Sequence, residues 1–296
     1  MTVGRVTHRM LTDGSLGNLQ LGLGRLAKVQ EQLSTGRLIN RPSDDPTGTT
    51  AAMRLRSSMS EKAQVERNVQ DGLGWLSQAD AALGSATEAV RRARDLALTG
   101  ANASASSTTS REALAVEVDA LRDTLLSVAN AAYLDRPVFG GVTAGQVAYD
   151  QSGAWVGTPG DVNRRISGDS QIKVDVPGPD AFGDGATSVF AELTALSAAL
   201  RAGDQSVVAA SVDTLNARMD AIVGARTAAG ARYERLEKVF VGVGDEQLDL
   251  DNRLSVIERA DLTATTVDLK MQEVAYQAAL AATSRVMQPS LLDFLR

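Results

Sequence analysis

Apolar residues in the second half of the chain recur at alternating spacings of four and three residues, from Val208 to Ile257. A repeat sustained over this length is typical of a rod-like helix that packs along a seam with other helices. Gly242 and Gly244 interrupt the pattern and predict a bend or break near residues 242–246. The seam positions are Val208, Val212, Leu215, Met219, Ile222, Ala229, Tyr233, Leu236, Phe240, Val243, Leu250, Leu254 and Ile257.

Two stripes in the first half of the chain have spacings that match this seam. Leu76, Leu83 and Val90 share one heptad position, and a second stripe repeats the four-and-three spacing. We therefore expect these segments to be the helices that pack against residues 208–257. The second stripe consists of Leu114, Val118, Leu121, Leu125 and Val128.

Each end of the chain carries an amphipathic helix whose apolar stripe has no sequence neighbour to cover it. Because an exposed leucine stripe in a lone monomer favours aggregation, we expect the two stripes to cover each other or a face on another copy. The N-terminal stripe is Leu16, Leu19, Leu23, Leu26 and Leu33, and the C-terminal stripe is Leu262, Leu269, Tyr276, Leu280 and Met287.

The prolines divide the chain, because proline is the strongest helix breaker. They leave residues 47–136 and 180–288 free for helices and punctuate a glycine-rich middle. The predicted fold is mainly α, a long coiled-coil-like helical bundle formed by both halves of the chain, with a small β-rich inserted domain. The predicted domains are a terminal helix pair (1–45 with 247–296), a helical bundle (46–132 with 186–246) and the insert (133–185).

Composition excludes most catalytic chemistry. The chain has no cysteine and a single histidine, His8, so thiolate metal sites, cysteine nucleophiles and multi-histidine sites are excluded. A net charge of −6 with both signs interspersed offers no basic face to nucleic acid. No apolar stretch reaches the roughly 18 residues of a membrane span, and residues 1–10 lack the apolar core of a cleaved signal peptide. We expect no enzyme activity, cofactor, metal, nucleic-acid partner or membrane partner.

Two acidic clusters have a chemical and a structural interpretation. Asp44 and Asp45 could serve acid–base or metal chemistry, but no third ligand or base accompanies them. We interpret them, with Ser43, as a cap and turn that opens the next helix. Asp249 and Asp251 resemble a calcium loop only faintly, because its glycine and distant glutamate are missing.

The turn after the N-terminal helix resembles the signature of bacterial flagellins and flagellin-like hook-associated proteins. That signature reads L-S-[ST]-G-x-x-I-N followed by D-D-x-x-G, and residues 33–48 here read LSTGRLINRPSDDPTG. Within the family, this form is most similar to the members that join hook to filament. The matching positions are Gly36, Ile39, Asn40, Asp44, Asp45 and Gly48.

Other segments carry the same resemblance. Residues 272–280 and 288–295 are similar to the carboxyl terminus of the hook-associated members, and residues 74–76 (GWL) also fit. The family's Y-L-F-G-G motif is present in two halves, because residues 135–138 separate Tyr133-Leu134 from Phe139-Gly140-Gly141.

The resemblance implies a non-enzymatic structural subunit of the bacterial flagellum. It implies paired terminal helices in an inner domain, export by the flagellar type III apparatus without a cleaved signal peptide, and an extracellular place in a ring between a neighbouring hook-associated protein and flagellin. Other copies of the chain would be partners in that ring. The expected assembly interface comprises Leu16, Leu19, Leu23, Leu26, Leu33, Leu262, Leu269, Tyr276, Leu280, Met287, Leu291, Leu292 and Phe294.

Two other functions stay open from the sequence. A filament flagellin would share the signature, and a coiled-coil signalling or regulatory protein would share the heptads. We also hypothesise an export chaperone that covers the C-terminal stripe before assembly.

Overall fold

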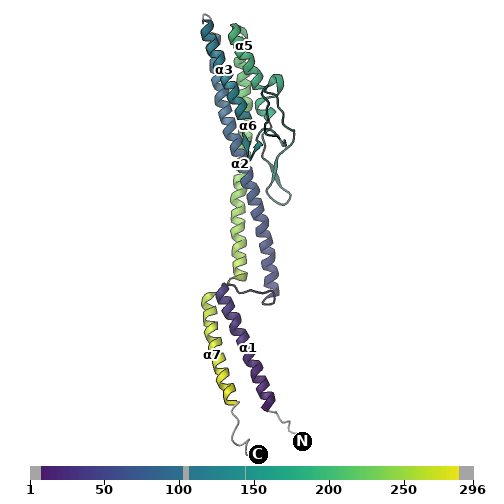
Figure 1. Ribbon diagram of the computed structural model, residues 1–296, viewed down its shortest axis with the longest axis vertical. Coiled ribbons are helices and arrows are strands. Elements are labelled where there is room, and N and C mark those ends of the chain that lie inside the picture. The colour runs from purple at the N-terminus through teal and green to yellow at the C-terminus, as the bar shows by residue number, and fades with distance from the viewer. Residues whose placement is uncertain (1–7, 103–106, 144, 287–296) are drawn as a thin grey trace, which may run out of the picture. The chain divides into compact units, whose positions relative to one another are not determined.

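The computed structural model describes residues 8–102, 107–143 and 145–286, which form two compact units. The first unit draws on the chain up to residue 61 and from residue 247 onward, and the second contains residues 62–246. The prediction of a mainly α fold with small β elements is confirmed (Figure 1). The helices are α1 (His8–Thr35), α2 (Pro46–Asn102), α3 (Thr108–Ala129), α4 (Gly178–Phe182), η1 (Gly185–Thr187), α5 (Val189–Ala202), α6 (Gln205–Glu258) and α7 (Leu262–Val286).

In the second unit, α2 and α6 run antiparallel along the predicted seam. As the residue number on α2 rises from 62 to 100, the number of its neighbour on α6 falls from 246 to 208. Lys62 pairs with Glu246, and Asp80 pairs with Arg226 at 2.8 Å. The buried apolar positions of α6 lie seven residues apart, at Val208, Leu215, Ile222, Ala229, Leu236 and Val243.

Two details of the seam prediction are wrong. Helix α6 is continuous through Gly242 and Gly244, so of the expected bend or break, the break does not occur. Tyr233, assigned to the seam, is 38% exposed at its edge. Val243, between the two glycines, is buried, and its packing helps to offset the helix-weakening effect of glycine.

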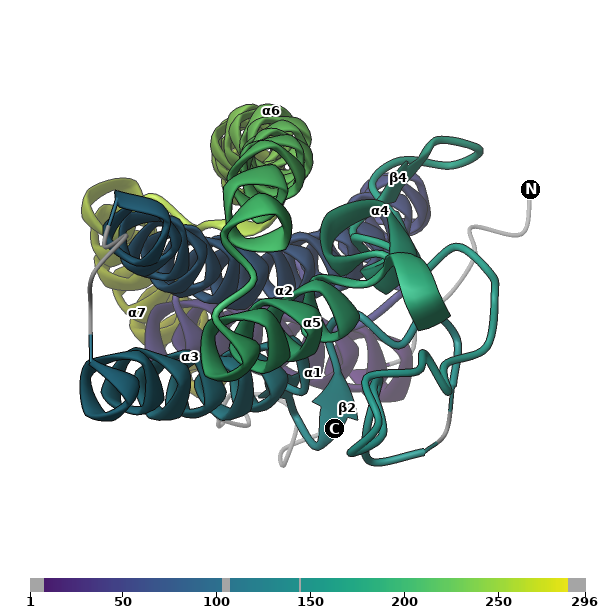
Figure 2. The same cartoon turned by 90° about the horizontal axis from the view of Figure 1, so that it is seen from above.

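Four helices of the second unit form a closed bundle, and an arginine–carboxylate pair links each adjacent pair of helices. Figure 2 shows α3, α5 and α6 grouped around α2. These exposed or half-buried pairs set register more than they add stability. They are Arg92–Glu117 between α2 and α3 (2.6 Å), Arg201–Asp119 between α3 and α5 (2.7 Å), Arg218–Glu192 between α5 and α6 (2.9 Å), and Arg226–Asp80 between α6 and α2 (2.8 Å).

Residues 133–185 contain two short antiparallel hairpins and pack on the bundle. Strand β1 (Ala132–Tyr133) pairs with β2 (Arg136–Pro137), and β3 (Asn163–Arg165) pairs with β4 (Gln171–Lys173). The aromatic rings of Phe139, Tyr149 and Phe182 form an edge-to-face cluster, and Phe190 of α5 joins it. Aromatic burial rather than an extended sheet therefore holds this segment.

Trp75 joins α2 to both hairpins. Its ring is 1% exposed and meets Tyr133 edge-on, with centroids 6.1 Å apart. The guanidinium groups of Arg136 and Arg164 lie 5.4 and 5.9 Å from the ring centroid, a cation–π arrangement. Gly74 makes room for this contact, because a β-carbon there would lie 2.7 Å from Cζ of Tyr133. The GWL segment (residues 74–76) and Tyr133, which are distant in the sequence, are thus in direct contact.

Asp175 fastens the second hairpin to α6 from a fully buried position. Its Oδ1 accepts a 2.7 Å hydrogen bond from the Val162 amide, and Lys173 Nζ lies 3.6 Å from Oδ2. Arg232 of α6 donates to the Asp175 carbonyl at 2.7 Å. Burial raises the pKa of the Asp175 carboxyl above its usual value.

Gly74→Ala is expected to destabilise the protein by about 1–3 kcal/mol, because the new methyl group collides with the Tyr133 ring. Gly230→Ala is the matched control on α6, where an added β-carbon meets no atom within 4 Å. The control should stabilise by about 0.5–1 kcal/mol through helix propensity. Thermal unfolding followed by circular dichroism separates the two, and equal shifts would contradict the Trp75–Tyr133 contact.

Acid is expected to weaken the bundle through Asp80. Two hydrogen bonds from Arg226 hold the pKa of this carboxyl below its usual 3.8. A group with a lowered folded-state pKa stabilises above its unfolded pKa, and that contribution is lost as pH falls through the lowered value. The melting temperature should therefore decrease when the pH is lowered under about 4. In the Asp80→Asn variant, the melting temperature should depend less on pH in this range. Asp123→Asn, at a carboxylate 76% exposed, is the control and should leave the slope unchanged.

Candidate assembly surfaces

The family turn lies in the first unit, where the chain passes from α1 to α2. Gly36 ends α1 in the left-handed conformation, at φ +67°, and its amide donates to the Gln32 carbonyl at 2.9 Å. The Leu38 amide donates to the Glu258 carbonyl at 2.7 Å, and the Ala260 amide donates to the Gly36 carbonyl at 3.0 Å. These two bonds join the α1–α2 connection to the α6–α7 connection.

Asp44 closes this turn from within. Its Oδ2 accepts hydrogen bonds from the Arg41 amide at 2.9 Å and the Asn40 amide at 3.3 Å, and its Oδ1 pairs with Lys28 of α1 at 3.0 Å. The Lys28 ammonium and the Arg41 amide lower the pKa of the Asp44 carboxyl. Asn40 in turn donates its side-chain amide to the Arg37 carbonyl at 3.2 Å.

Asp45, rather than Ser43 or Asp44, caps α2. Its Oδ1 accepts from the Gly48 amide at 2.9 Å. Gly48 has no alternative here, because a β-carbon would overlap the Asp45 carboxylate and approach Cδ1 of Ile39 to 2.7 Å. Each motif residue therefore has a steric or hydrogen-bonding task in the turn, and both carboxylates act in the cap and turn.

The terminal helices α1 and α7 pack against each other in the first unit, and their free ends point the same way (Figure 1). Gly22 of α1 faces Tyr276 of α7, since a β-carbon at Gly22 would lie in van der Waals contact with Cδ2 of Tyr276, at 3.4 Å. Part of the predicted stripe is half-buried, namely Leu19, Leu26, Leu33, Leu269 and Tyr276.

The remainder of the predicted stripe faces outward. The exposed fractions are 53% for Leu16, 52% for Leu23, 53% for Leu262 and 44% for Leu280. The single stripe predicted for each helix thus divides into a half-buried part and an exposed part. Met287, Leu291, Leu292 and Phe294 lie outside the described residues.

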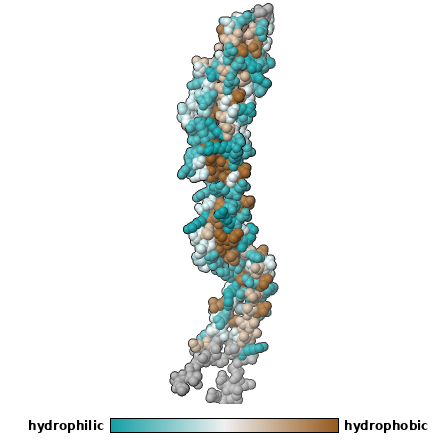
Figure 3. All heavy atoms as spheres, turned by 180° about the vertical axis from the view of Figure 1, so that it is seen from behind, coloured by the Kyte–Doolittle hydropathy of each residue, from teal (hydrophilic) through white to brown (hydrophobic). Residues whose placement is uncertain are grey.

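A second apolar row on α7 was missed from the sequence. Val267, Met271 and Val274 are 63%, 58% and 65% exposed and follow a four-and-three spacing. Leu248 and Val256 of α6, in the same unit, are 63% and 85% exposed. Figure 3 shows apolar side chains gathered in separate patches on one face of the helices. The four-and-three spacing of residues 267, 271 and 274 could have predicted this row. The leucine stripe of the same helix has the stronger pattern and was the one recognised.

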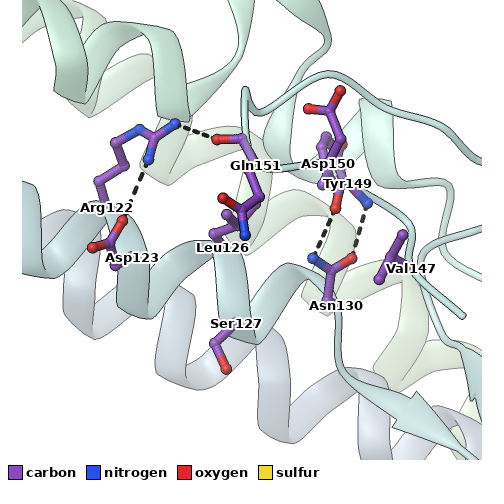
Figure 4. A pocket seen from close by; sticks show the side chains of 9 residues that line it. All are labelled: Arg122, Asp123, Leu126, Ser127, Asn130, Val147, Tyr149, Asp150 and Gln151. Atoms are coloured by element: carbon purple, nitrogen blue, oxygen red, sulfur yellow. Dashed lines mark hydrogen bonds and ion pairs between the residues drawn. The ribbon is translucent and has the colours of Figure 1, made fainter.

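A hollow of about 680 Å³ lies in the second unit between α3 and residues 147–151. Arg122 donates to the Gln151 carbonyl at 2.8 Å, and Asn130 bonds the backbone of Ala148 and Tyr149 (Figure 4). These polar side chains already form hydrogen bonds with the backbone of residues 148–151. We therefore interpret the hollow as the place where α3 attaches to the insert, rather than as a ligand site.

The described residues hold neither a metal-binding cluster nor a membrane-spanning helix. Within residues 8–102, 107–143 and 145–286, no three His, Cys, Asp or Glu side chains are placed to hold a metal ion. None of the helices described is both long and apolar enough to cross a membrane.

Residues 6–137 match the family model of the bacterial flagellin N-terminal helical region. Over 98% of this chain and 99% of the relative, the sequence is 23% identical to flagellar hook-associated protein 3 of Escherichia coli K12. The chain is similar to FlgL-type flagellar proteins. The FlgL crystal structure from Bacillus cereus matches with a TM-score of 0.60 and 20% identity, over 68% of this chain and 99% of that one. A flagellin from Clostridium tyrobutyricum is 30% identical, but the FlgL-like chain spans only about a third (33%) of its length.

Gly48→Ala is expected to destabilise the first unit of the FlgL-like chain by about 1–3 kcal/mol, because the methyl group disrupts the Asp45 cap and displaces Ile39. Gly24→Ala in α1, where a β-carbon meets no atom within 4 Å, is the control and should be neutral or stabilising. Hydrogen exchange at the amides of residues 36–48 reports the change locally. Unaltered protection in the Gly48 variant would refute the steric role.

Proposed function

We propose that this chain is a structural subunit of the bacterial flagellum, at the junction between the hook-associated ring and the flagellin filament. Support comes from hook-associated protein 3 of Escherichia coli, whose similarity extends over nearly the whole of both chains. Flagellar filament core proteins of Treponema match over a similar extent, so a filament subunit is the second candidate function. The family turn disfavours a signalling coiled coil.

The outward apolar rows of the first unit are the observation that carries this proposal. Val267, Met271 and Val274 stay exposed among the described residues, so another chain can cover them. Burying such a side chain gains roughly 1.5–3 kcal/mol, so a row of three can drive association after its entropic cost. Other copies of the chain, a neighbouring hook-associated protein and flagellin are the partners we propose.

Two further parts of the proposal concern location and export. A subunit at this junction is extracellular, and it reaches that place without a cleaved signal peptide. An export chaperone is a proposed transient partner at the C-terminal helix, because the α7 row is apolar and uncovered within the described chain. The subunit performs no catalysis in this role.

Met271→Asp is expected to reduce incorporation into flagella by more than about tenfold while leaving the melting temperature of the free chain within a few degrees. The reason is that Met271 is 58% exposed in the free chain and so contributes little to its folding. Met271→Leu, which keeps the apolar surface, is the matched control. Immunoblots of isolated flagella measure incorporation, and wild-type levels of the aspartate variant would argue against an assembly role for this row.

Deleting the gene tests the function itself. A hook without a filament, with filament protein lost to the medium, is the expected phenotype, and the unaltered gene should restore the filament. Normal filaments in the deletion strain would refute the proposed junction role.

A further inference from the structure

The β1–β2 hairpin displays Leu134 in a backbone conformation that leucine disfavours. Leu134 and Asp135 form a two-residue loop with φ of +47° and +60°. Positive φ at both positions is the type I′ turn, where asparagine and glycine are preferred. Leu134 is nonetheless 74% exposed. Because a turn with only a folding role would favour asparagine or glycine, the leucine points to a contact outside the chain.

The same unit carries a hollow of a size to receive such a side chain. It encloses about 200 Å³ between α2 and α6, and its lining includes Leu76, Ala229 and Tyr233. Gly230 also lines it, and a β-carbon there would meet no atom within 4 Å. Tyr233, a seam residue, is left 38% exposed beside it. The hollow is thus an apolar opening in the seam rather than a packed part of it.

Leu134 and the hollow lie on opposite sides of α2 at one level. The hairpin sits on α2 through Tyr133, which contacts Gly74 and Trp75, whereas the hollow is lined by Ser77 of the same helix. Trp75 and Ser77 are two residues apart, which places their side chains about 200° apart around the axis and only about 3 Å apart along it.

Charges beside the two features are complementary. The exposed residue Asp135 follows Leu134 directly in the loop. Asp80 lines the hollow and pairs with Arg226, and both side chains are 46% exposed. A second copy presenting its hairpin here can therefore place Asp135 near Arg226.

We propose that Leu134 of one copy inserts into the α2–α6 hollow of the next copy. The two surfaces differ and lie at one level on opposite sides, so the contact is head-to-tail and closes into a ring or continues as a helix. This inference rests on the proposed function, which places copies side by side. It adds a lateral contact in the second unit that is independent of the terminal helices.

Crosslinking tests the contact in the full chain. The sequence has no cysteine, so Leu134→Cys and Ser77→Cys supply the only thiols. In flagella whose only copy is the double variant, a short bismaleimide should join chains into dimers and higher multimers. Each single variant should stay uncrosslinked, because the contact is not self-paired. A double variant that is present in flagella but remains monomeric overturns the inference.

Two variants that should not impair folding provide a second test. Leu134→Asn suits the turn and Gly230→Leu fills the hollow while favouring the helix, so both should keep or raise the melting temperature. Both should nevertheless reduce incorporation into flagella by at least about tenfold. Leu98→Gln on α2, at a side chain 42% exposed, is the matched control and should change neither property. Normal incorporation of the asparagine and leucine variants overturns the contact.

The outcomes separate this contact from the proposed function. If even the unaltered chain is absent from flagella, the proposed function fails, and crosslinking of the concentrated, purified double variant then decides the contact. If the thiol of the Leu134→Cys variant is captured by flagellin or another flagellar protein instead of a second copy, the junction function stands and the self-contact is refuted.

Discussion

The antiparallel packing of α2 against α6 is the contact on which the second unit depends. The buried apolar positions on α6 lie seven residues apart, so one narrow stripe meets α2 over the length from residue 208 to 243. A seam this narrow can be made with small and medium aliphatic side chains, which accounts for an aromatic content of only 4%. The other helices and both hairpins attach to this pair through individual contacts such as Trp75 and Asp175.

Aspartate and arginine residues, which often act in catalysis or metal binding, hold turns and helices in place in this chain. The adjacent carboxylates of Asp44 and Asp45 are occupied by backbone amides and Lys28, and arginines of the bundle bind carboxylates of neighbouring helices. Most of the described polar groups therefore hold helices and turns in place. Apolar side chains remain exposed on the surface, and a structural subunit needs such a surface for assembly.

The two units differ in how much of their apolar surface is covered. The second unit buries a continuous core, from Val69 to Leu236. The first has few fully buried side chains, among them Ala52 and Ala260, and leaves long apolar residues such as Val256 exposed. A pair of helices such as α1 and α7 encloses little core, because each has only one side facing the other. The described residues of the first unit therefore leave exposed the kind of apolar surface that the second unit buries.

The sequence by itself determined the helical character, the seam and the turn, since heptad spacing and the Gly36–Gly48 motif are local patterns with few alternative structures. It predicted the terminal stripes but not which of their residues pack inward. Periodicity identifies the apolar side of a helix, but it does not identify the element that covers that side. Only the tertiary structure decided that Leu26 is half-buried where α1 packs on α7 while Leu23 stays exposed. It alone brought Gly74 and Tyr133 into one contact, because residues distant in sequence meet only when the chain folds back on itself.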